Sequence, residues 1–254
     1  TYFLISRYEE MIRPDIRDKH GRTIGTESIL GRSGWLDKPV VDMYGVCLRQ
    51  LINEYFHVKA EERTGFSSIC LTHDIDIPWE AFTLIGAIKR VLGIIKRTGK
   101  LDLYPIFNLL GYPQKDPLYT FLDLCEIDKK IEKSRVIYFV KSGGRTRPFD
   151  YPVYIKTRAF RRLLRQLNDS NCVFGFHSSY SCGVDPELIP EELNTLERIL
   201  GNKVSINRNH YLDSRDPSDY RYLIQSGITD DYTMGYADIS GFRLGTSRIV
   251  RWID

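Results

Sequence analysis

From residue 66 onward, the chain alternates between short apolar runs and longer amphipathic stretches. A short apolar run bounded by polar residues is typical of a buried strand, whereas apolar positions repeated every three to four residues are typical of a helix with one buried face. The runs predict strands at residues 66–71, 136–140, 172–176, 204–206 and 228–231. The stretches between them predict helices at residues 80–97, 116–133, 157–167, 190–200 and 217–225. We expect Thr157 to cap the third of these helices and Gly201 to end the fourth.

The order of these elements indicates the fold class. Short strands separated by helices of this length imply parallel β-α units. Their repetition predicts an α/β protein with a (β/α) barrel, open or closed, and we expect a distorted or incomplete barrel over residues 66–254. Residues 1–65 differ, because a basic, turn-rich segment precedes one amphipathic helix at residues 40–54. We expect them to be an N-terminal appendage or the end of an upstream domain, in a chain whose natural start precedes Thr1.

Composition excludes some classes of protein. Hydrophobic residues make up 42% and charged residues 27% of the 254 residues, as in ordinary globular proteins. A net charge of +3 is too small to argue for nucleic acid, so we expect no such partner. No apolar stretch is long enough for a transmembrane segment. The five cysteines form no C-x-x-C pair, and Cys70 and Cys172 are expected to be small buried hydrophobes. This pattern favours a cytoplasmic location over association with the cell envelope, without deciding between them.

Titratable side chains follow four of the five predicted strands, and the carboxyl ends of barrel strands are where chemistry occurs. These side chains are His73, Asp74 and Asp76, then His177, then Arg208 and His210, and finally Asp230 and Asp231. Asp74 and Asp76 are alternate residues of an extended segment, so they point the same way, and one can bind a cation while the other handles a proton. Three histidines beside this pair favour a metal-assisted or acid-base site. His20 and His57 look incidental.

The motifs around these residues resemble those of the polysaccharide deacetylase family, the NodB-type carbohydrate esterases, over roughly residues 66–250. T-H-D-I-D at residues 72–76 resembles the first family motif, commonly T-F-D-D, in the form T-H-D-[VI]-D of a bacterial subgroup. H-S-S-Y-S at residues 177–181 resembles the second motif, H-[ST]-x-x-H, with Ser181 in place of the second histidine. R-N-H-Y at residues 208–211 resembles R-P-P-Y without the prolines. The last motif, L-x-x-H, has no match, so we expect the barrel to be truncated at its C-terminus or His210 to replace that histidine.

The resemblance implies a NodB-like barrel and a metal-dependent hydrolase that removes N-acetyl groups from a glycan or glycan precursor. It implies that Asp74 is the general base, held by Arg208, and that Asp76 and His177 are metal ligands. His210 is expected to donate the proton to the leaving amine. The oxygen and nitrogen ligands suit zinc best, with cobalt or nickel as alternatives.

The resemblance does not fix the complete ligand set, the sugar-stacking side chains or the reaction. Two ligands are too few for a tight zinc site, and we expect His210 or Asp74 to be the third, with His73 on the opposite face of its strand. Candidate sugar-stacking side chains, for which packing at the barrel rim is the alternative, are Trp79, Tyr180, Tyr211 and Tyr236. Ser181 in a ligand position favours a degenerate barrel that binds carbohydrate without hydrolysing it. A hydrolase of small amides is the other alternative, which a closed pocket would favour over a wide aromatic groove.

Overall fold

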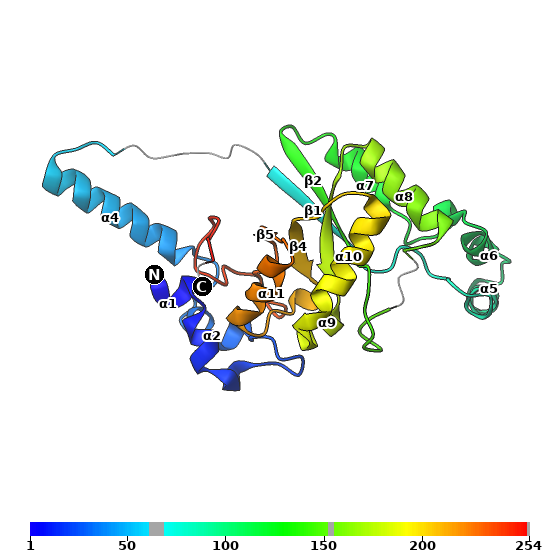
Figure 1. Ribbon diagram of the computed structural model, residues 1–254, viewed down its shortest axis with the longest axis horizontal. Helices are drawn as coiled ribbons and strands as arrows, with labels where there is room; N and C mark the ends of the chain where they lie inside the picture. The colour runs from blue at the N-terminus through cyan, green and yellow to red at the C-terminus, as the bar shows by residue number, and fades with distance from the viewer. Residues whose placement is uncertain (61–68, 152–154, 253–254) are drawn as a thin grey trace.

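A five-stranded parallel sheet organises the computed structural model, which describes residues 1–60, 69–151 and 155–252. Its strands lie side by side in chain order and curl into a half-barrel (Figure 1). They are β1 (Ile69–Ile75), β2 (Ser134–Val140), β3 (Val173–Ser178), β4 (Ile206–Asn209) and β5 (Asp230–Asp231). The predicted α/β class is confirmed, and the curled sheet is compatible with an incomplete barrel.

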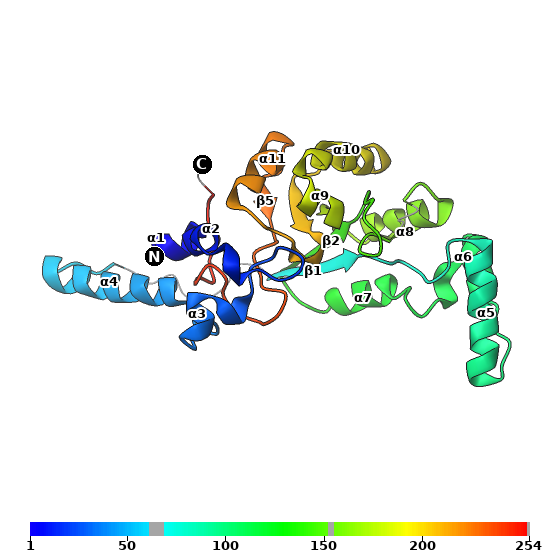
Figure 2. The same ribbon diagram turned by 90° about the horizontal axis from the view of Figure 1, so that it is seen from below.

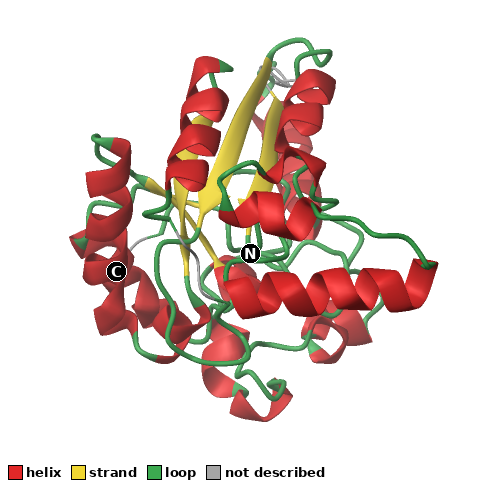
Figure 3. Cartoon of the chain, turned by 90° about the vertical axis from the view of Figure 1, so that its right-hand side faces the viewer, coloured by secondary structure: helices red, strands yellow, loops and turns green. Residues whose placement is uncertain are grey.

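Helices connect the strands and cover the sheet (Figure 3). Those between strands are α5 (Leu84–Thr98), α6 (Tyr104–Leu109), α7 (Phe121–Asp128), α8 (Arg158–Asp169), α9 (Tyr180–Val184), α10 (Ile189–Leu200) and α11 (Tyr220–Gln225). Those before the sheet are α1 (Tyr2–Ile5), α2 (Tyr8–Ile12), α3 (Ile29–Arg32) and α4 (Val40–Phe56). The predicted ends of two helices are confirmed: the Thr157 hydroxyl accepts a hydrogen bond from the N–H of Phe160, and Gly201 ends α10 at a φ of 76°.

The C-terminal half of β2 is buried on both faces of the sheet, which explains its continuous apolar run. Tyr138 and Val140 join α8 and α10 in the main hydrophobic core. Ile137 and Phe139 point to the opposite face, where they pack with Ile206. Because alternate residues of a strand face opposite ways, this second face also receives the even-numbered side chains of β1 and the odd-numbered ones of β3.

Several predicted boundaries differ from the structure, and the helices expected at residues 80–97 and 217–225 and the last strand start later, at Leu84, Tyr220 and Asp230. The helix expected at residues 116–133 is reduced to α7, because the Asp116 carboxylate instead accepts hydrogen bonds from the N–H groups of Glu80 and Leu118 and ends a turn there. β1 and β4 run on into polar residues, so that Asp74 and Arg208 lie near a strand end rather than after it. The expected strand start at residues 66–68 lies outside the described residues. Cys70, expected to be buried, is exposed, while Cys172 is buried as predicted.

The N-terminal helices pack on the loops that follow β4 and β5 (Figures 1 and 2). Glu10 is the centre of this contact, since both of its carboxylate oxygens accept hydrogen bonds of 2.8 Å from the guanidinium of Arg243. Arg7 donates to the same carboxylate and to Ser214. Burial raises the pKa of Glu10, but the two arginines outweigh burial and lower it from 4.5 to about 2.

We expect Glu10→Gln to lower the free energy of unfolding by about 3 kcal/mol, because it leaves two buried guanidinium groups without their anion. The pKa of Glu10 is lower in the folded state, so its contribution is present above about pH 4.5 and is lost as the pH falls toward 2. Urea unfolding at neutral and acid pH measures both effects. Glu126→Gln is the control, since its ion pair with Lys129 is exposed to solvent, which screens the attraction between the two charges. Equal stabilities of the two variants would contradict the prediction.

Candidate metal centre

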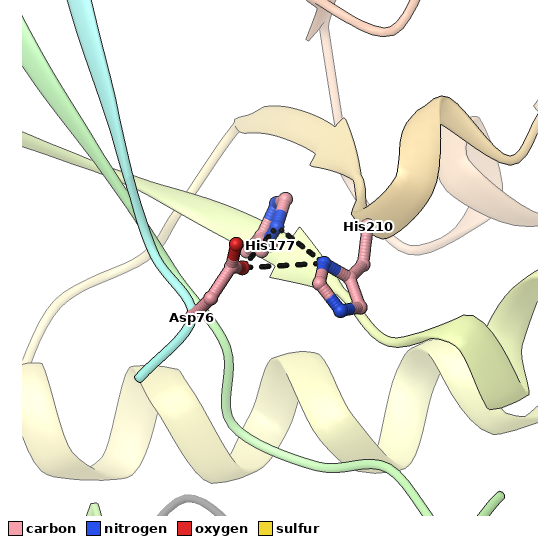
Figure 4. Close-up of side chains that lie close together, drawn as sticks. All are labelled: Asp76, His177 and His210. Atoms are coloured by element: carbon pink, nitrogen blue, oxygen red, sulfur yellow. Dashed lines mark hydrogen bonds and ion pairs between the residues drawn. The ribbon is translucent and has the colours of Figure 1, made fainter. Parts of the chain in front are cut away.

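Three side chains from different strands meet at the carboxyl edge of the sheet (Figure 4). Asp76 directly follows β1, His177 lies in β3, and His210 follows β4. The Oδ1 atom of Asp76 is 3.1 Å from Nε2 of His177 and 3.2 Å from Nδ1 of His210. The two histidine nitrogens are 3.1 Å apart. The predicted gathering of strand-end side chains is therefore present.

The near-equal distances fit three ligands of one cation. Tetrahedral zinc with bonds of about 2.0–2.1 Å has neighbouring ligand atoms about 3.3 Å apart. Asp76 Oδ1 is buried and, within the described residues, no donor is aligned on it for a hydrogen bond. An orphaned carboxylate oxygen beside two imidazole nitrogens is a donor set that could hold a metal ion.

The tautomer of His177 can be assigned from its other contact. Nδ1 of His177 is 2.8 Å from the carbonyl oxygen of Arg208, which can only accept a hydrogen bond, so Nδ1 carries the proton. In the neutral ring, Nε2 then presents a lone pair to Asp76 and His210. A lone pair that faces a carboxylate is repulsive without a proton or a cation between them, and a hydrogen bond from the far nitrogen to a carbonyl is usual for metal-binding histidines.

Asp76 is held in its charged form. Burial raises the pKa of the Asp76 carboxyl, but His177 and His210, when their rings carry a proton toward it, outweigh burial and hold this pKa well below its usual range. The carboxylate is therefore anionic at neutral pH, as a metal ligand must be.

Asp74 forms a separate ion pair beside this cluster. Its Oδ1 accepts from the Arg208 guanidinium at 3.0 Å, which is the pair expected from the sequence, and Arg208 also donates to the Thr72 hydroxyl at 2.8 Å. The guanidinium stacks 4.5 Å from the centre of the Phe139 ring. Gly175 makes room for that ring, since a Cβ there would lie 2.6 Å from its atoms. Of the two expected third ligands, the structure brings His210 into the cluster rather than Asp74. This position favours a ligand role for His210 over that of proton donor.

The remaining strand-end candidates lie elsewhere. His73 points to the other face of β1, as expected from strand alternation, and contacts Asp128 at 2.8 Å. Asp231 accepts from the Asn207 amide and the Thr233 hydroxyl, and Asp230 accepts from the Thr229 hydroxyl. These contacts give the three residues structural partners away from the cluster.

Ser181, at the position of the second motif histidine, serves another purpose. Its hydroxyl donates to Asp150 at 2.6 Å and accepts from the backbone N–H groups of Arg145 and Thr146. It thus fixes the loop after β2 instead of facing Asp76, His177 and His210. The sequence suggests a lost ligand at this position, whereas in the structure His210, which follows the neighbouring strand β4, is the third residue of a group that could hold a metal ion.

The four aromatic candidates are placed in three different environments. Trp79 is 2% exposed and packs in the main core near Phe160, so the packing alternative describes it. Tyr236 packs against the small N-terminal cluster around Leu30 and Val40. Tyr211 lines the cleft that also contains Asp76, His177 and His210. The buried ring of Tyr180 packs against Tyr211, and its hydroxyl lies 3.1 Å from Nδ1 of His20, so neither Tyr180 nor His20 lines the cleft itself.

The cleft has a volume of about 370 Å³ and includes one charged residue that our sequence reasoning missed. Lys141 directly follows β2, is fully buried, and has no hydrogen-bond partner for Nζ among the described residues. Burial lowers its pKa, against the opposing charges of Asp76, Asp150 and Glu192. The expectation that site residues follow the strands, applied to lysine as well as to histidine and aspartate, would have identified Lys141.

The backbone after His210 is unusual. Tyr211 and Leu212 have φ angles of 63° and 51°, in the left-handed region that non-glycine residues rarely adopt. The Tyr211 carbonyl accepts a hydrogen bond from Arg22 at 2.7 Å, which holds this turn against the N-terminal segment. Strained residues of this kind cluster at functional sites, where the surrounding structure maintains them.

The comparisons with known proteins concern the N-terminal part alone. Residues 1–57 match the model of a family described as "Family of unknown function (DUF7033)", a span that includes α1 to α4 and stops before β1. No curated protein and no solved structure matches the chain. Among the described residues, no helix has the length and apolar character needed to cross a membrane.

Proposed function

We propose that the protein is a metal-dependent hydrolase that removes N-acetyl groups from a glycan or glycan precursor. The observation that carries the proposal is the Asp76–His177–His210 cluster with the Asp74–Arg208 ion pair beside it in one cleft. The motif resemblance to the NodB-type carbohydrate esterases supports the same reaction. With His210 the group again has three candidate ligands, as it would have with the missing motif histidine, and this weakens the case for a degenerate binding barrel.

The cluster and the ion pair divide the chemistry between them. Asp76, His177 and His210 would hold a divalent cation, zinc before cobalt or nickel, which supplies a Lewis acid and lowers the pKa of water. Asp74 takes a proton from the attacking water as its oxygen bonds to the acetyl carbon. When the C–N bond breaks, Asp74 returns that proton to the amine, so that acetic acid and the amine form, and the acid then loses its proton to give acetate and an ammonium group. Arg208 orients Asp74 for both steps through the ion pair between their side chains.

Lys141 is suited to the charge that develops on the acetyl oxygen. A buried ammonium without a partner does not have to break a protein contact to meet an oxyanion, and fixed charges in a cleft of low polarity stabilise transition states strongly. Tyr211 and the exposed ring of Tyr151 line the same cleft and offer apolar faces to a sugar.

We expect Lys141→Gln to lower kcat by about a hundredfold with little change in KM. Its thermal stability should stay equal or rise, because the substitution removes an unpartnered buried cation. Lys141→Arg, which keeps the charge, should retain more activity than Lys141→Gln. Steady-state kinetics and thermal unfolding measure the two effects. A stability loss with unchanged kcat would assign Lys141 a purely structural role.

The test of the function itself is acetate release from N-acetylated oligosaccharides by the protein loaded with zinc. The matched negative control is Asp74→Asn, which keeps the three ligands. Release by wild type alone supports the proposal. A folded, metal-loaded protein that releases acetate from small amides but not from oligosaccharides would refute the glycan substrate, and one that releases none from either would refute the hydrolase.

A further inference from the structure

Helix α5 carries an exposed apolar stripe along its whole length. At 100° per residue, five apolar side chains fall within one arc of about a quarter turn or slightly more. They are 39–68% exposed: Leu84, Ile85, Ile88, Leu92 and Ile95. The adjoining side is buried, since Ala87, Val91 and Ile94 face the rest of the structure, where α6 is the main neighbour of α5. The exposed stripe is therefore additional to the apolar face that the fold uses.

Cations border this stripe on its other side. Lys89 and Lys96 follow the apolar arc directly, and Arg97 and Arg90 lie beyond them. From Leu84 to Lys100 the sequence contains five basic residues and no acidic one. Arg90 pairs with Glu80, whereas in the described ranges neither Lys89 nor Lys96 has an acidic partner within ion-pair distance. Both lysines are exposed.

The position of α5 suits contact with an extended surface. The hairpin of α5 and α6 forms one end of the molecule, and α5 projects past α7 in the second view (Figures 1 and 2). The segment after α5 adds Leu101 and Leu103, which are 67% and 44% exposed, beside Lys100. A flat partner can thus reach both the stripe and the lysines.

Helix α4 provides an internal comparison. It also exposes large apolar side chains, among them Tyr44, Leu48 and Leu51. Its charged residues are Asp42, Arg49 and Glu54, so no cationic band accompanies the apolar side. Apolar exposure alone does not indicate what covers α4, whereas α5 combines it with charge of one sign.

We propose that α5 binds in the plane of an anionic lipid bilayer surface. An amphipathic helix with lysines beside its apolar face buries that face at the boundary between headgroups and acyl chains, while the lysines meet lipid phosphates. The stripe, the adjacent cations and their position at one end of the molecule are the features that such a surface recognises. The inference does not depend on the proposed hydrolase activity.

The experiment is co-sedimentation of the full chain with vesicles of phosphatidylcholine, with and without phosphatidylglycerol. We expect binding to the phosphatidylglycerol vesicles and at least about tenfold weaker binding to phosphatidylcholine alone. Lys89→Gln with Lys96→Gln should weaken binding about tenfold, as should Ile88→Gln with Leu92→Gln. Leu48→Gln with Leu51→Gln, the same exchange on α4, should bind like wild type.

Three results would overturn the proposal. They are absence of wild-type binding to the anionic vesicles, loss of binding in the α4 pair but not in the α5 pairs, and a dimer in solution that the Ile88→Gln, Leu92→Gln pair dissociates while vesicle binding is unchanged. The last would assign the stripe to a second copy of the chain. Circular dichroism of each variant checks that the substitutions at these exposed positions leave the fold intact.

Discussion

Asp76→Ala and His177→Ala should each lose bound divalent cation and lower acetate release by about a thousandfold. Each variant removes one of the three candidate ligand atoms, which lie 3.1–3.2 Å apart, and two ligands are too few for tight binding. A cation bound there would contribute several kcal/mol of transition-state stabilisation to the proposed reaction, and each 1.36 kcal/mol corresponds to a factor of ten in rate. Elemental analysis of the two purified variants and of wild type measures the bound metal.

Two matched variants sharpen this experiment. His57→Ala removes an exposed histidine outside the cleft and should keep the metal. Ser181→Ala changes the motif position that resembles a ligand but faces Asp150, and it should keep the metal as well. His210→Ala should lose it. No cation in wild type after incubation with excess zinc at neutral pH would refute the metal centre, and metal retained by His210→Ala would refute this ligand set.

Asp74→Asn should keep the metal and still lose about a thousandfold in kcat. The amide has the shape of the carboxylate but cannot take a proton from water, and general acid-base groups contribute about a hundredfold to ten-thousandfold. Asp74 lies outside the ligand cluster, so the metal content separates its role from that of Asp76. Steady-state kinetics with N-acetylated oligosaccharides measures the loss.

The partner of Asp74 supplies the control. Arg208→Gln should also keep the metal and should lose less activity than Asp74→Asn, because it removes the group that orients the base but leaves the base in place. If Asp74→Asn loses metal together with activity, Asp74 is a ligand and the assignment of His210 must be revised.

The alternation of short apolar runs and amphipathic stretches along the chain was sufficient to predict the parallel β-α architecture. Apolar runs indicate buried strands, so the order of β1 to β5 and the longer helices between them followed from the pattern, whereas the short helices α6 and α9 were not predicted. The strand ends did not, because β1 and β4 continue into polar residues whose side chains face the cleft. A strand assigned from an apolar run ends at the first polar residue, although the backbone hydrogen bonds to the neighbouring strand continue beyond that residue.

The sequence by itself determined the members of the candidate site on β1, β3 and β4, since polar residues after parallel strands must gather at one edge of the sheet. Strand alternation was also enough to separate His73 from Asp74 and Asp76. The tertiary structure alone decided which atoms converge. It brought His210 to Asp76 and His177, turned Ser181 toward Asp150, buried Trp79 in the core and left Lys141 without a partner in the cleft. These outcomes depend on packing between segments far apart in the chain, and local patterns contain no information on distances of that kind.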